Sequence, residues 1–404
     1  MSVLNLIRPE LLDNQPYTRP LSKLAEGSEV RGDAEHRTGV YTQLHEDSST
    51  ASTKQCTSSV AFGKRSTVGS APMRHRLHAN ELPWSALSTN INLNFYPEKY
   101  LQNQLQEQLA KHYQVEEKQI VLTRGSDDGI DLITRLFLSA GQDACLQFPP
   151  TFSMYSFYIY LQHAQLFECP LDAQNNFQLS LHDIRSNWQN NCKIIFLCNP
   201  NNPTGKLIDL NFIATLCNEY KNRSVIVVDE AYIEFAQAQS ATCLIPQFDN
   251  LIVLRTLSKA YGLANLRLGI ILAQAHVIHA LNKIIPPFPI SSVVIDLALR
   301  ALEKNEWFLQ AINTIKASRT KLMKELQLCP VIKKVYPTEA NFILVKTQHT
   351  CELVSWLANQ GIVIKSFSPH SSLHDHLRIT VGDESQNQLL LRALSSFQNN
   401  VSGY

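Results

Sequence analysis

The sequence lacks features that would place it in several common protein classes. It has no uninterrupted apolar run of about 20 residues, the length that spans a bilayer. The N-terminus, MSVLNLIRPE, lacks the basic region and apolar core of a secretory signal. None of its nine cysteines forms a C-x-x-C pair. We therefore expect a cytoplasmic protein in a reducing compartment, with no membrane partner.

The chain also has no excess of either charge. Its 36 Lys and Arg residues against 35 Asp and Glu leave a net charge of +1, whereas nucleic-acid partners usually require a basic excess on one face. The motifs G-x-S-x-G, H-E-x-x-H and G-x-G-x-x-G are absent, which argues against common hydrolases, zinc proteases and dinucleotide-binding proteins. We therefore expect the protein to bind small-molecule ligands and not a nucleic acid.

Length and composition predict several parts. With 404 residues and 44% hydrophobic content, the chain is long enough for two domains. We predict an N-terminal arm (1–21), a low-complexity insertion (22–76), a large domain (77–286) and a small C-terminal domain (287–404). Ser and Thr make up 11 of the 23 residues from 48 to 70, so we expect the insertion to be disordered.

From residue 99 onward, apolar runs alternate with helical patterns. The stretch 99–113 repeats leucine every four residues, which is typical of an amphipathic helix. The apolar runs that follow are QIVLT, ACLQF, KIIFLC, SVIVVD, LIVLRT and LGIILA. Apolar runs separated by helices predict an α/β layer with a mainly parallel sheet. A long helical stretch (about 292–327), followed by KKVYP, NFILVK, TCELVSWLANQG, IVIKSF and LRITVG, predicts a smaller α+β unit.

Polar segments follow four of the predicted strands, at the edge of the sheet where α/β proteins bind ligands. RGSDDG begins a helix whose N-terminus suits an anion. The other three segments are NPNNPTG, with Asn202; EAY, which follows Asp229 and contains Tyr232; and LSKAYGLANLRLG, with Ser258, Lys259 and Arg267. Each segment alone has a plain structural interpretation as a helix cap, a turn or a strand end.

Taken together, these residues meet the requirements of pyridoxal 5'-phosphate. A lysine forms a Schiff base, a carboxylate keeps the pyridine nitrogen protonated, and a phenol and an amide hydrogen-bond the ring oxygen. Ser126, Ser258 and Arg267 would cradle the phosphate. We expect Lys259 to be buried, because burial lowers the pKa of an amine enough for it to attack a carbonyl.

The ordered motifs resemble those of a known enzyme family. They are LHANELP, FYPE, RGSDDGIDLI, PPTFSMY, NPNNPTG, VVDEAYIEF, RTLSKAYGLANLRLG and LRITVG. The chain resembles the fold-type I, pyridoxal-phosphate-dependent aminotransferases, and in particular the histidinol-phosphate aminotransferases, from about residue 77 to 395 and near Tyr17. The resemblance implies a large α/β domain with a mainly parallel central sheet and a smaller α+β domain.

The resemblance also implies roles for individual residues. Lys259 would hold the cofactor and shuttle a proton, Asp229 would pair with the pyridinium, and Tyr232 and Asn202 would contact the ring oxygen. The residues that it assigns to the cofactor phosphate are Ser126, Asp127, Ser258 and Arg267.

Further residues are assigned to stacking, to a second subunit and to the substrate. Phe152 would stack on the ring, and Tyr96 would reach the cofactor phosphate of a neighbouring subunit, which implies a homodimer. The residues assigned to the substrate anion are Tyr17, Asn341, Lys365 and Arg378. Two of these positions depart from the family pattern. Phe152 stands where Tyr is common, and Lys365 replaces a frequent Arg, which exchanges a planar fork for a point charge.

The implied reaction is a transamination of histidine biosynthesis. It converts L-histidinol phosphate and 2-oxoglutarate into imidazole acetol phosphate and L-glutamate. Aromatic aminotransferases and phosphothreonine decarboxylases share the same lysine constellation and remain alternatives. A pyridoxal-phosphate-binding transcription regulator would need a DNA-binding head within residues 1–76, but these hold 10 basic and 8 acidic residues and no helix-turn-helix periodicity.

One group of potential metal ligands lies near the C-terminus, in SPHSSLHDH. The spacing of its histidines and aspartate matches no standard zinc pattern. We therefore expect a surface loop there and no metal.

Overall fold

The computed structural model describes residues 3–12 and 79–401, with only the backbone described from residue 399 onward. The predicted insertion (22–76) and Tyr17 lie outside the described residues. Among the described residues, contacts group 3–12 and 85–401 into one compact unit. The finer division of the chain at residue 286 stays a prediction. No helix in the described part of the chain is long and apolar enough to cross a membrane.

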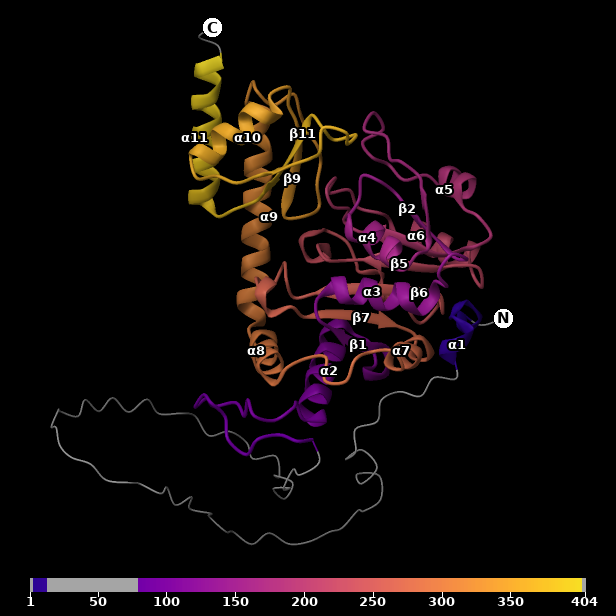
Figure 1. The fold of residues 1–404 in the computed structure, drawn as a ribbon. Coiled ribbons are helices and arrows are strands. Elements are labelled where there is room, and N and C mark those ends of the chain that lie inside the picture. The colour runs from indigo at the N-terminus through magenta and orange to yellow at the C-terminus, as the bar shows by residue number, and fades with distance from the viewer. Residues whose placement is uncertain (1–2, 13–78, 402–404) are drawn as a thin grey trace, which may run out of the picture. The chain divides into compact units, whose positions relative to one another are not determined.

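A seven-stranded sheet forms the core of the larger α/β layer (Figure 1). Its strands are β1 (Ile120–Thr123), β2 (Ala144–Gln147), β3 (Gln165–Glu168), β4 (Cys192–Cys198), β5 (Val225–Asp229), β6 (Leu251–Thr256) and β7 (Gly269–Ala273). They lie in the order β1-β7-β6-β5-β4-β2-β3, and only β7 runs antiparallel to its neighbours. The predicted mainly parallel sheet is therefore confirmed.

Helices cover both faces of this sheet. Successive residues of a strand point to opposite faces, and the central strands are buried throughout, so both faces need a covering layer. Ile120 and Leu122 of β1 join one buried cluster with Leu105, whereas Val121 joins another with Ile130. The helices of the first cluster include α2 (Lys99–Tyr113), α5 (Leu181–Asn187) and α6 (Leu210–Glu219). Those of the second are α3 (Ser126–Phe137), α4 (Met154–Leu161) and α7 (Ala275–Asn282).

The N-terminal arm packs on this second cluster. It consists of a 3-10 turn (Val3–Leu6) and the short helix α1 (Pro9–Leu12), and its Val3, Leu6 and Ile7 are buried there. Further 3-10 turns lie at Glu117–Gln119, Ile233–Phe235, Ala241–Leu244 and Ala264–Leu266.

The C-terminal part contains a four-stranded antiparallel sheet with helices packed against it (Figure 1). The strand order is β10 (Lys365–Ser366), β11 (His376–Thr380), β9 (Phe342–Lys346) and β8 (Lys334–Val335). The helices are α9 (Asn305–Gln327), α10 (Thr350–Asn359) and α11 (Glu384–Val401). Their leucines form one buried cluster with Ile343, Val345, Leu377 and Ile379 of the sheet. This arrangement confirms the predicted α+β unit.

The structure differs from the sequence prediction in some elements. The predicted helix over 292–327 is two helices, α8 (Ser292–Leu302) and α9, because Lys304 between them has a non-helical backbone (φ −93°, ψ 44°). The run IVIKSF contributes only the two residues of β10. The apolar runs also missed β3, whose residues are all partly or fully exposed because it is the edge strand.

Candidate active site

Polar residues gather at the carboxyl ends of the parallel strands β4, β5 and β6. Asp229 is the last residue of β5 and lies beside Cys198 of β4 and Leu254 of β6 in the strand register. Asn202 follows the end of β4, and Lys259 follows the end of β6. Since neighbouring parallel strands end at one edge, their terminal loops converge on one region.

Asp229 is buried, with 2% of its surface exposed. The Tyr155 hydroxyl donates a hydrogen bond to its Oδ2 (2.9 Å), and the Ala231 N–H donates one to its Oδ1 (3.1 Å). Burial raises the pKa of Asp229 to about 6, although both hydrogen bonds favour the carboxylate and lower the pKa. Such a buried carboxylate suits a cationic partner, because a paired buried charge costs far less than an isolated one.

Tyr155 is a site residue that the sequence analysis did not single out. It lies on α4, is fully buried and stacks on Phe196 of β4 with ring centroids 4.6 Å apart. Phe152, half-buried in the loop before α4, meets the Tyr155 ring edge-on at 5.6 Å. Since Phe152 and Tyr155 both belong to the quoted PPTFSMY motif, the phenol three residues after Phe152 was the available signal.

The raised pKa of Asp229 predicts a pH-dependent stability of the protein without cofactor. The folded state binds this proton more tightly than the unfolded chain, so ionisation of Asp229 destabilises the fold as the pH rises from about 4 to about 6. We expect the cofactor-free Asp229→Asn variant to exceed the cofactor-free wild type in unfolding free energy by up to about 3 kcal/mol above pH 6. Urea denaturation at several pH values measures this difference, which should shrink toward pH 4. A difference that grows toward pH 4 would contradict the prediction.

Tyr232, Asn202 and Arg378 form a connected polar group. Asn202 Nδ2 donates to the Tyr232 hydroxyl at 3.5 Å, and Arg378 Nη1 donates to Asn202 Oδ1. Burial raises the pKa of Tyr232 above its ordinary value, so the phenol keeps its proton. The guanidinium of Arg378, on β11, lies 5.3 Å from the centroid of the Phe342 ring. The C-terminal sheet thus brings a cation to the edge of the larger sheet.

The other two described candidates for the substrate anion flank Arg378 in the C-terminal sheet. Lys365 of β10 is exposed and lies directly opposite Arg378 in the strand register. Asn341 is half-buried just before β9, and its carbonyl oxygen accepts a hydrogen bond from the Val381 N–H (2.9 Å).

Lys259 is exposed, so the predicted burial of its side chain is wrong, whereas the predicted lowering of its pKa through loss of hydration is confirmed. The physical reason is its position in the loop beyond β6, where the buried residues of the strand have ended. Its Nζ lies 5.7 Å from the centroid of the Tyr232 ring. Partial loss of hydration and then the charge of Arg378 lower the pKa of Lys259, while Asp127 and Asp229 act in the opposite direction. A lowered pKa increases the share of neutral amine, the form that is nucleophilic.

An anion cradle lies at the start of α3. Ser126 and Asp127 form the first turn of this helix, where free N–H groups attract anions. Arg267 Nη2 donates to Asp127 Oδ2 at 3.2 Å. The Thr256 hydroxyl donates to Ser258 Oγ at 2.9 Å and so orients this side chain. A helix start, a guanidinium and a serine hydroxyl are suitable donors for a phosphate.

Two glycines leave room in this cradle. Gly125 precedes α3 with φ +85°, and a Cβ on it would lie 2.6 Å from Arg267 Nη2. A Cβ on Gly269, the first residue of β7, would lie only 2.3 Å from the backbone carbon of Gly125. Both positions therefore exclude a side chain, and the cradle fits a phosphate group because the backbone can approach it closely.

We expect Gly269→Ala to disrupt this cradle. The added methyl group must push β7 away from the start of α3, which should lower the free energy of unfolding by about 1–3 kcal/mol and weaken pyridoxal phosphate binding. Gly141→Ala is a suitable control for the added methyl group, since no atom lies within 4 Å of the added carbon, although the positive φ of Gly141 (+71°) adds a backbone strain that Gly269 does not have. Urea denaturation and equilibrium dialysis measure the two effects. Unchanged cofactor affinity in Gly269→Ala would argue against the cradle.

A buried ion-pair cluster connects the loops beside the site. Arg255 of β6 lies 3.3 Å from Glu230 and 2.7 Å from Glu234, and all three side chains are almost fully buried. Glu230 directly follows Asp229, and Arg255 precedes the Lys259 loop. Loss of one partner would leave a buried charge unpaired, so this cluster keeps the ends of β5 and β6 in a fixed arrangement.

Tyr96 lies before α2 and is exposed, with 51% of its surface accessible. Its ring stacks on Phe288, in the loop between α7 and α8, with centroids 4.6 Å apart.

Comparison with known proteins identifies the family. Residues 69–394 match the family model described as aminotransferase class I and II. Histidinol-phosphate aminotransferase 1 of Legionella pneumophila (strain Lens) is 58% identical to the chain over 336 residues, which cover 83% of the chain and 92% of that protein.

Solved structures share the fold. The histidinol-phosphate aminotransferase of Clostridium acetobutylicum matches with a TM-score of 0.70 and 23% identity, over 76% of this chain and 92% of that one. The enzyme of that name from Sinorhizobium meliloti, in complex with pyridoxal 5'-phosphate, matches with a TM-score of 0.67 and 22% identity, over 75% and 83% of the two chains. The chain therefore belongs to the class I and II aminotransferases, which are pyridoxal-phosphate-dependent transaminases.

Proposed function

We propose that the protein is a histidinol-phosphate aminotransferase of histidine biosynthesis, which converts L-histidinol phosphate and 2-oxoglutarate to imidazole acetol phosphate and L-glutamate. The observation that carries the substrate assignment is the 58% identity to a histidinol-phosphate aminotransferase over nearly its whole length. The site supports it, because an arginine of the C-terminal sheet reaches the cofactor residues: Arg378 hydrogen-bonds Asn202.

We assign the cofactor residues on the basis of the family resemblance, and the geometry of the site is compatible with these roles. Asp229 would hold the proton on the ring nitrogen, and Tyr232 and Asn202 would hydrogen-bond the ring oxygen. Phe152 would stack on the ring. The residues that would hold the phosphate are Ser126, Asp127, Ser258, Arg267 and, from the partner subunit of a dimer, Tyr96. When bound, pyridoxal phosphate supplies a ring that draws electrons away from the substrate α-carbon.

Lys259 would act as attachment point and as general base. Its amine must be neutral to accept the proton from the substrate α-carbon, and its lowered pKa favours that form. Loss of hydration and the positive charge of Arg378 thus lower the pKa of Lys259 and increase the share of neutral amine.

Arg378 and Lys365 would bind the anionic ends of both substrates. They are direct neighbours across β11 and β10 and so lie on the same face of the C-terminal sheet, and Arg378 hydrogen-bonds Asn202. Histidinol phosphate carries a phosphate and 2-oxoglutarate a second carboxylate, and the same cations can serve both because the two substrates bind in turn. We assign Asn341 and Tyr17 to the same anion-binding group.

We further propose a cytoplasmic homodimer. Three large side chains around the start of α2 are exposed, namely Leu93, Tyr96 and Tyr100, as is typical of a contact surface. Mixing Lys259→Ala subunits with Tyr96→Ala subunits, each of which we expect to be inactive by itself, tests this assignment. If Tyr96 serves the partner's site, mixed dimers regain one intact site, and activity should recover to about a quarter of the wild-type level. No recovery, although subunit exchange is verified, would contradict it.

The substrate assignment is tested with a panel of amino donors. We expect kcat/KM for histidinol phosphate to exceed that for phenylalanine, and we expect no carbon dioxide from phosphothreonine. A purified protein that carries the cofactor but does not convert histidinol phosphate would refute the substrate while leaving the transaminase chemistry intact.

A further inference from the structure

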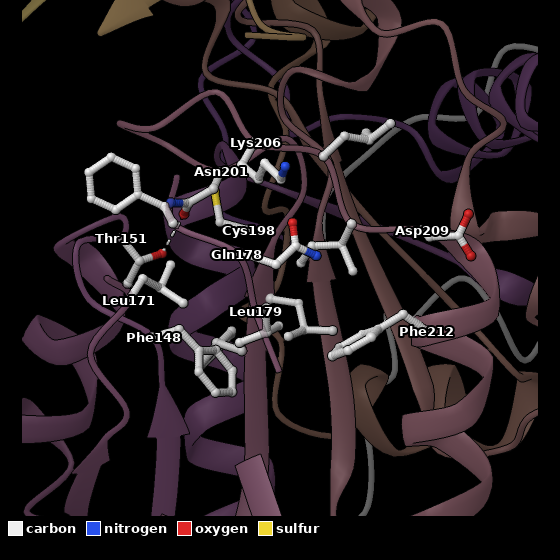
Figure 2. Close-up of a pocket in the computed structure, with 15 residues that line it drawn as sticks. Phe148, Thr151, Leu171, Gln178, Leu179, Cys198, Asn201, Lys206, Asp209 and Phe212 are labelled. Atoms are coloured by element: carbon white, nitrogen blue, oxygen red, sulfur yellow. Dashed lines mark hydrogen bonds between the residues drawn. The ribbon is translucent and has the colours of Figure 1, made fainter. Parts of the chain in front are cut away.

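A cavity of about 180 Å³ lies next to the NPNNPTG turn (Figure 2). Its walls come from the end of β2, the end of β4, the segment 171–179 and the start of α6. The cavity is separate from the anion cradle, because none of Ser126, Asp127, Ser258, Lys259 or Arg267 lines it. We call it the β4 cavity.

Apolar side chains form most of the β4 cavity. In Figure 2, Phe148, Leu179 and Phe212 line its lower part, and Leu171 lies at one side. An apolar cavity of about 150 Å³ is large enough to bind benzene, so the β4 cavity has room for one aromatic ring and a short chain. Phenylalanine-rich walls favour an aromatic occupant, because aromatic rings attract one another beyond their area of contact.

Lys206 places a positive charge at the polar border of the cavity. In Figure 2, Lys206 lies at the upper border and Gln178 lies between it and Leu179. Lys206 forms no ion pair with any residue that the structure describes. The carboxylate of Asp209 accepts a hydrogen bond from the Asn211 N–H (2.8 Å) and so caps α6. An apolar body with a cation at one end is complementary to a ring with an anionic group.

We propose that the β4 cavity binds a small aromatic carboxylate, with the ring among the phenylalanine and leucine side chains and the carboxylate at Lys206. Neither the family comparison nor the proposed reaction requires such a site. Its occupant would be an effector of the enzyme, because the cavity adjoins residues that hold the active site.

The coupling runs through a short hydrogen-bonded path. The Thr151 hydroxyl donates to Asn201 Oδ1 (2.9 Å), and both residues line the cavity. Their next neighbours in the chain are Phe152 and Asn202. Cys198, a third lining residue, accepts a hydrogen bond from the Asn202 N–H through its Sγ (3.3 Å). An occupant therefore contacts the residues that position Asn202 and Phe152, and we expect it to change kcat rather than compete with substrate.

The test uses the cofactor-loaded enzyme and isothermal titration with 3-phenylpropanoate, with 3-phenylpropanamide as the neutral probe. Leu179→Trp should fill the cavity and weaken binding of both probes at least about tenfold. Lys206→Gln should weaken binding of the carboxylate about tenfold and leave that of the amide unchanged. The exposed Lys333→Gln serves as the charge-matched control and should bind both probes like the wild type.

Two further variants address misfolding of Leu179→Trp and binding of the probe at the substrate site. Leu171→Phe fills the cavity with a smaller change, in case Leu179→Trp does not fold. Arg378→Gln removes the proposed substrate anchor and should retain binding of 3-phenylpropanoate, which separates the β4 cavity from the substrate site. No saturable binding up to about 10 mM would overturn the proposal. Binding that is lost in Arg378→Gln but kept in the folded cavity-filling variants would overturn it as well.

Discussion

Replacement of Lys259 by alanine should abolish transamination and lower kcat by at least about a thousandfold. The side chain has two roles in our account, attachment of the cofactor and transfer of the α-proton. The position of Lys259 suits both roles: its Nζ lies 5.7 Å from the Tyr232 ring, and loss of hydration and the charge of Arg378 lower its pKa. The same variant should also lose the visible absorbance that a lysine-bound pyridoxal phosphate gives.

The appropriate controls are Lys259→Arg and Lys333→Ala. Arginine keeps the positive charge but its guanidinium stays protonated and cannot attack a carbonyl, so Lys259→Arg should be as inactive as the alanine variant. Lys333 is exposed at the start of the C-terminal sheet, and its replacement should leave turnover unchanged. Near-normal turnover in Lys259→Ala would show that another group performs both steps.

Replacement of Asp229 by alanine should lower kcat by about a hundredfold or more while the protein remains folded. Asp229 is the buried carboxylate at the end of β5, and without its charge the proton on the ring nitrogen loses its stabilising partner. Asp229→Asn keeps the shape of the side chain but removes its charge. It should lose nearly as much activity as Asp229→Ala, because the charge is what stabilises the proton on the ring nitrogen. Single-turnover kinetics with known cofactor occupancy separate this effect from weaker cofactor binding.

Tyr155→Phe provides the graded comparison. It keeps the aromatic ring on Phe196 and removes the hydroxyl that donates to Asp229. A hydrogen bond to a charged group contributes about 1.5–3 kcal/mol, so we expect a smaller loss of kcat than in Asp229→Ala. If cofactor-loaded Asp229→Ala kept more than about a tenth of the wild-type kcat, the assigned role of Asp229 would be wrong.

The sequence predicted most of the large sheet because its central strands are buried on both faces. Such strands appear as uninterrupted apolar runs, as in Val225–Asp229. Edge strand β3 has the sequence QLFE and no buried residue, so it gives no comparable signal. The break between α8 and α9 depends on the local backbone at Lys304, in a stretch whose residues all suit a helix.

The arrangement of the site was less accessible from sequence. The order of the motifs predicted that Asp229, Asn202 and Lys259 lie at strand ends. The contact between Arg378 and Asn202 was not predictable in this way, because it joins β11 of the C-terminal sheet to the loop after β4, 176 positions away in the chain. We predicted a buried Lys259 because a reactive amine needs a lowered pKa, which burial can provide. Its actual exposure depends on the conformation of the loop after β6, which the sequence does not reveal. Tyr155 was missed because its partner is set by the packing of α4 on β4 and β5.

The most direct measurement of the central claim is a map of the residue that binds the cofactor. The cofactor-loaded enzyme is reduced with sodium borohydride, which makes the bond between lysine and cofactor permanent, and is then digested and sequenced by mass spectrometry. We predict that the pyridoxyl group is found on Lys259 alone. A label on another lysine, or no label on a protein that binds pyridoxal phosphate tightly, would contradict the account.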